Sequence, residues 1–70
     1  MTDNLDLAAS AQELADAAPA GSLDRAAAAS VAITLATTRD AAQARQTLDG
    51  LAPDDVRQAA LRLFDRLRGA

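Results

Sequence analysis

The residues that could perform acid–base chemistry in this 70-residue chain are ten carboxylates, and the densest pair is Asp54-Asp55. General acid–base catalysis usually draws on His, Cys, Lys or Tyr as well, and the sequence contains none of these. Both aspartates directly follow Pro53, where a helix is expected to begin and where negative charge is favourable. We therefore expect the pair to start a helix. We expect the protein to have no enzymatic activity, no cofactor, no metal site and no small-molecule substrate.

Basic side chains could instead bind nucleic acid, and all seven in this chain are arginines. A helix over 39–48, a turn at Gly50 and a helix over 53–68 would have the spacing of a helix-turn-helix. A small DNA-binding regulator of the antitoxin or phage type is therefore an alternative function. The start of the second helix would have to approach DNA phosphates, and Asp54 and Asp55 would repel them. A structural helical hairpin without a nucleic-acid partner is the favoured interpretation.

One short motif resembles the sequence around the phosphopantetheine-bearing serine of acyl carrier proteins: Gly21-Ser22-Leu23-Asp24. The resemblance covers four residues and implies a carrier role for Ser22. The acidic residue that usually precedes the serine is replaced here by glycine, and residues 26–29 are alanines where the family has acidic residues. Serine is also a common helix N-cap. We therefore keep the carrier role only as a third possibility.

Composition bounds the size of the hydrophobic core. Leu, Ile, Val and Phe make up only 14 residues, whereas alanine alone makes up 20. A single domain of this length struggles to bury enough apolar area, and small domains often compensate by oligomerising. The net charge of −3 argues against binding to anionic surfaces. The longest uncharged run, 26–38, is shorter than the roughly 20 residues that span a bilayer. We therefore expect a cytoplasmic protein that does not bind membranes.

Periodicity predicts an all-α, compact four-helix mini-domain with helices at about 4–18, 22–37, 39–48 and 53–68. The first three and last two residues are expected to fray. The second helix is alanine-rich and apolar on nearly every side, so it should be central and surrounded by the other helices. Its only polar strip consists of Ser30, Thr34 and Thr37, which we expect to face solvent or to bond back to the preceding turn.

The sequence also predicts the faces and ends of the individual helices. The first helix should bury four residues that share one face: Leu7, Ala11, Leu14 and Ala18. Thr37-Thr38 could cap a separate third helix, although a continuous helix over 23–48 is the alternative. After the third helix, Gly50 suits the left-handed backbone conformation that often ends a helix.

These observations favour a non-enzymatic protein-interaction module that forms a homodimer or binds another protein. On the helix over 53–68, Leu61 and Phe64 widen the apolar stripe, and Arg57 and Arg68 flank one of its edges. On the first helix, Leu5 falls on the polar side without an intramolecular reason. The candidate interaction surface therefore consists of these five residues.

Overall fold

The computed structural model describes residues 4–69 and contains four helices: α1 (Asn4–Ala17), α2 (Leu23–Thr37), α3 (Ala41–Asp49) and α4 (Asp54–Gly69). The all-α four-helix prediction is confirmed, and within 4–69 the chain forms no strand. Residues 1–3 and 70, which were expected to fray, lie outside the described part, whereas Gly69 still belongs to α4. No helix in that part is long and apolar enough to cross a membrane.

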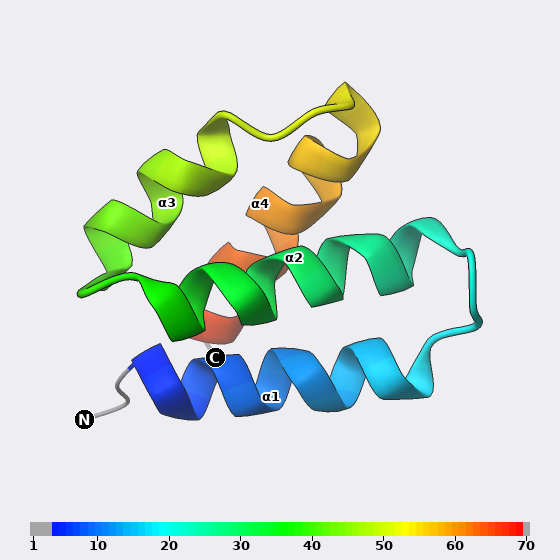
Figure 1. The fold of residues 1–70 in the computed structure, drawn as a ribbon, viewed down its shortest axis with the longest axis horizontal. Helices are drawn as coiled ribbons and strands as arrows, with labels where there is room; N and C mark the ends of the chain where they lie inside the picture. The colour runs from blue at the N-terminus through cyan, green and yellow to red at the C-terminus, as the bar shows by residue number, and fades with distance from the viewer. Residues whose placement is uncertain (1–3, 70) are drawn as a thin grey trace.

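The pair of antiparallel helices α1 and α2 forms the most extensive contact in the molecule (Figure 1). Their facing sides bury mostly alanines, so the two backbones can approach closely. Side-chain hydrogen bonds join the two helices at both ends of the pair. At one end, the Asn4 amide donates to the carbonyl and hydroxyl oxygens of Thr38, both at 3.3 Å. At the other end, the Arg25 guanidinium donates to the carbonyl oxygen of Ala18 at 3.2 Å.

The larger core side chains come from the other contacts of α2. Helix α4 passes behind α2 in Figure 1, and α3 packs against both α2 and α4. The largest fully buried side chains are those of Phe64, Leu35, Leu48 and Val31. On the outside, Arg45 on α3 forms an ion pair with Asp65 on α4, but both side chains are more than half exposed. Such a pair contributes only about 0–1 kcal/mol, so α3 is held mainly by packing.

Helix α1 turns a different side to the core from the one that its sequence predicts. Leu7 and Ala11 are buried as expected, but Leu14 is 44% exposed, and Ala15 is buried in its place. The predicted role of Leu14 is therefore wrong. The alanines fit the narrow space against α2, and the larger leucine is displaced to the edge of the contact.

The chain breaks between α2 and α3, which excludes the continuous helix over 23–48. The residue that caps α3 is Asp40, whose carboxylate accepts the Gln43 N–H at 2.8 Å. The prediction that Thr37-Thr38 would cap α3 is wrong, because these residues end α2 instead. The Thr38 hydroxyl donates to the Thr34 carbonyl at 2.7 Å, and the Thr38 backbone is extended. A side-chain hydroxyl that donates to the carbonyl four residues earlier satisfies an acceptor that is left without a partner at the helix end.

The rotation of α2 about its axis also differs from the prediction. Thr34, placed in the outward polar strip, is only 6% exposed. Ile33, expected among the surrounded apolar residues, is 65% exposed. Because α2 is apolar on nearly all sides, its hydrophobic pattern does not determine which side faces the core.

The left-handed backbone conformation occurs at a different glycine from the one predicted. Gly50 ends α3 with φ −96°, so the predicted left-handed conformation is wrong at this position. Gly50 and Leu51 instead donate to the carbonyls of Thr47 and Leu48 at 3.1 Å, which closes a tight turn. The left-handed glycine is Gly21, with φ +80°, in the turn between α1 and α2. A glycine accommodates that conformation without the steric cost that a side chain would carry.

We predict that Asp40→Ala lowers the free energy of unfolding by about 1 kcal/mol, because it removes the side chain that caps α3. Asp49→Ala is the matched control, since Asp49 is an exposed aspartate at the opposite end of the same helix. Its removal should cost nothing, because a negative charge at a helix C-terminus is unfavourable. Urea titration followed by circular dichroism, at one fixed chain concentration, measures both. Equal losses for the two variants would contradict the capping assignment.

Candidate functional site

The acidic pair at the start of α4 has local structural partners. Asp54 forms an ion pair with Arg57 one turn later at 3.1 Å, and the Asp55 carboxylate accepts the Val56 N–H at 2.8 Å. Both aspartates are exposed. Across residues 4–69, no three His, Cys, Asp or Glu side chains lie close enough together to hold a metal ion. These contacts give Asp54 and Asp55 a structural role in the first turn of α4.

Ser22, the residue of the carrier-protein resemblance, is the N-cap of α2. Its hydroxyl oxygen accepts the Arg25 N–H at 3.1 Å, and its backbone is extended as N-caps usually are. The side chain is half-buried. The predicted helix cap is therefore confirmed.

The structure places four of the five candidate interaction residues together on one edge of α4. Arg68 lies over the ring of Phe64, with its guanidinium carbon 5.6 Å from the ring centroid. The ring itself is fully buried, and Leu61 beside it packs partly against the core. Phe64 is therefore a core residue of the monomer, and its contribution to an interaction surface stays a prediction. Arg57 forms an ion pair with Asp54, and Leu61 is half-buried. This edge of α4 therefore exposes little apolar area.

The fifth residue, Leu5, lies elsewhere, on the edge of α1 that adjoins the end of α2. Its side chain is 68% exposed. It lines a shallow depression together with Leu35, Ala36 and Arg39, and no residue of α4 contributes to that depression. The structure thus separates Leu5 from the α4 residues with which the sequence analysis grouped it.

The side of α2 that points away from the core continues from this depression. Ala26, Ile33 and Ala36 are exposed and recur at intervals of seven and three residues, which places them on one side of the helix. Helix α4 packs against α2 and passes behind it in Figure 1. We call the surface formed by Leu5, Ala26, Ile33 and Ala36 the α1–α2 face. Sequence reasoning missed Ile33, because only the orientation of α2 distinguishes it from the buried residues next to it.

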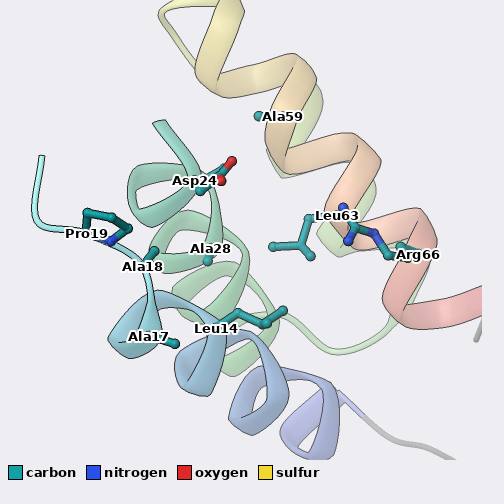
Figure 2. Close-up of a pocket in the computed structure, with 10 residues that line it drawn as sticks. Leu14, Ala17, Ala18, Pro19, Asp24, Ala28, Ala59, Leu63 and Arg66 are labelled. Atoms are coloured by element: carbon teal, nitrogen blue, oxygen red, sulfur yellow. The ribbon is translucent and has the colours of Figure 1, made fainter. Parts of the chain in front are cut away.

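A separate apolar cleft of about 390 Å³ lies between α1, α2 and α4 (Figure 2). Leu14 from α1 and Leu63 from α4 line it, together with alanines of all three helices. Its charged residues are Asp24 on α2 and Arg66 on α4, which stand on different walls. Exposure of Leu14 to this cleft accounts for its incomplete burial. The cleft could hold an apolar side chain. The side chains that line it do not place an acid, a base and a nucleophile within reach of one another.

The helix-turn-helix alternative finds little support in the geometry of α3 and α4. Asp54 and Asp55 remain exposed where DNA phosphates would approach. Two arginines of this region are already paired, Arg57 with Asp54 and Arg45 with Asp65. A phosphate-binding surface needs several free basic side chains on one face.

Comparisons with models of known protein families, with curated proteins and with solved structures find no match to this chain.

We predict that Phe64→Ala lowers the free energy of unfolding by about 3–5 kcal/mol, because it empties the largest fully buried site. Leu5→Ala should change it by less than about 0.5 kcal/mol in the monomer, because Leu5 is exposed. Urea titration at a chain concentration low enough to prevent association measures both. Similar losses for the two variants would show that Leu5 is part of the monomer core.

Proposed function

We propose that this chain is a cytoplasmic, non-enzymatic protein-interaction module that self-associates through the α1–α2 face. The observation that supports the proposal is the 65% exposure of Ile33 on the most apolar helix of the fold. An apolar helix normally has neighbours on every side. Here α1, α3 and α4 leave one side of α2 uncovered, and a second chain would cover it.

The core contains few large side chains, so burial of the uncovered side of α2 would add substantially to the buried apolar area. Eight of the fourteen buried apolar residues between positions 4 and 69 are alanines, each of which buries little area. Full burial of a large aliphatic side chain is worth about 1.5–3 kcal/mol. Leu5 and Ile33 retain most of that potential gain, because both are about two-thirds exposed. Association through this face would add them to a core that has few large residues.

The α1–α2 face also suits close helix packing. The residues around Ile33 on this side of α2 are short, with Ala26, Ala36 and Thr37 exposed and Ala29 and Ser30 half-buried between them. Small residues allow two helix axes to approach to the lower end of the ~8–10 Å range. No charged residue lies on α2 between Arg25 and Arg39, so the centre of the face would bury no charge.

We predict that the wild-type chain forms a dimer in sedimentation equilibrium and that Ile33→Glu weakens the dimer at least about tenfold, because it places a charge in the interface. Ala42→Glu is the matched control, since Ala42 is an exposed helical residue on α3, outside the α1–α2 face. It should leave the dimer unchanged. Circular dichroism would verify that both variants remain helical.

The cleft gives the experiment a second discriminating variant. Leu14→Glu introduces the same charge at the cleft wall, away from Ile33. If Leu14→Glu disrupts association and Ile33→Glu does not, the interface is the cleft and the proposed face is wrong. A wild-type chain that stays monomeric at high micromolar concentration would overturn the proposal, and salt-sensitive binding to DNA would then favour the regulator alternative.

A further inference from the structure

The α1–α2 face carries two exposed side chains of opposite charge, one toward each end, whereas Arg25, near the end of the face that holds Asp16, is half-buried and donates to the Ala18 carbonyl. Arg39 lies at the end near Leu5, where both residues line the same depression. Asp16 lies toward the other end of α1, eleven residues after Leu5 and therefore on the same side of the helix. Gln12, which also shares that side, donates to the Asp16 carboxylate at 3.0 Å. Asp16 and Arg39 are both exposed, and within residues 4–69 neither has an ion-pair partner.

The positions of these charges along the face follow from the antiparallel pairing of α1 and α2. Asn4 contacts Thr38 at one end, and Ala18 contacts Arg25 at the other. Between these two contacts, each step forward along α1 therefore corresponds to one step backward along α2. Residues paired in this way lie at the same position along the two helix axes. By this correspondence, Asp16 is level with Ala27 on α2. The residue midway between Ala27 and Arg39 is Ile33, the most exposed large apolar residue of α2.

We propose that the partner for this face is a second copy of the chain, packed antiparallel about a two-fold axis that passes beside Ile33. The inference rests on the proposed self-association and specifies its geometry. A two-fold axis at this level brings Arg39 of each copy to the Asp16 end of the other. A symmetric interface repeats each contact, so the dimer contains two such charge pairs and one central contact between the two Ile33 side chains.

Charge selects this arrangement over the parallel one. If the two-fold axis ran parallel to the helices, each residue would lie at the same position along the helix axis as its own copy in the partner. Arg39 would then lie near the partner's Arg39, and Asp16 near the partner's Asp16. Like charges brought together destabilise an interface and suppress wrong arrangements. The antiparallel arrangement avoids both contacts and keeps the charges at the rim, outside the apolar centre.

Charge reversal tests the geometry. Asp16→Arg and Arg39→Asp should each weaken the dimer about tenfold, because each creates two like-charge contacts at the rim. The double variant Asp16→Arg/Arg39→Asp restores opposite charges and should return the dissociation constant to within about threefold of wild type. Raising the salt concentration should shrink these differences. Circular dichroism melts of each variant at low concentration would separate changes in association from changes in folding.

Three results distinguish the possible failures. A dimer that Ile33→Glu disrupts but that neither charge reversal weakens would overturn the antiparallel geometry and leave the α1–α2 face standing. A dimer weakened by both single reversals and not restored by the double variant would also overturn it. A wild-type chain that does not self-associate would overturn the proposed function itself.

Single-cysteine cross-linking gives an independent test, because the chain contains no cysteine of its own. A residue beside a two-fold axis lies next to its own copy, so Ile33→Cys should form a disulfide-linked dimer under mild oxidation. Ala26→Cys is the matched control on the same side of α2. It lies about 10 Å along the helix from Ile33 and so about 20 Å from its own copy, whereas a disulfide requires Cα atoms within about 7 Å. Equal cross-linking of the two variants, or none with Ile33→Cys, would contradict the antiparallel axis.

Discussion

The constraint on which the rest of the structure depends is the alanine-based contact between α1 and α2. Ala11, Ala15, Ala28 and Ala32 are all buried, and their small side chains let the two backbones pack closely. Close packing of small residues gains dispersion contacts but removes little apolar area from water. The fold must therefore obtain its bulk from the other side of α2, where α3 and α4 supply Leu48 and Phe64. Two of the four largest fully buried side chains therefore come from α3 and α4, and none comes from α1.

The same constraint leaves α2 with neighbours on only part of its circumference. Helices α1, α3 and α4 each pack against part of α2, and the chain between positions 4 and 69 provides no further helix. An apolar helix in this position must leave some of its apolar residues exposed. Which of them are exposed depends on the orientation of the helix, and Thr34 is buried while Ile33 is not. Ile33 is therefore exposed because the domain has too few elements to surround its central helix.

The sequence predicts those features whose signals are local. The Ser22 cap and the Gly50–Pro53 turn lie at helix ends as predicted, and all four helices begin and end within about two residues of the predicted bounds. The errors concern orientation. A helix of alanines, leucines and threonines offers no strong preference for one side, so Leu14 and Thr34 were assigned to the wrong sides. Phe64, one of the candidate interaction residues, is buried for a physical reason. Phe64 is large and apolar, and a core composed mostly of alanine needs that side chain inside.

The charges on the α1–α2 face carry information that the apolar residues lack. Ile33 and its neighbouring alanines would allow a partner helix in either direction, since apolar contact is not directional. Asp16 and Arg39 lie at opposite ends of the same face, and α1 and α2 hold them there through the Asn4–Thr38 and Arg25–Ala18 contacts. Their separation makes the two directions of approach unequal in energy. Because exposed charges contribute little to affinity, their effect is to select one geometry, while the apolar centre supplies most of the binding energy.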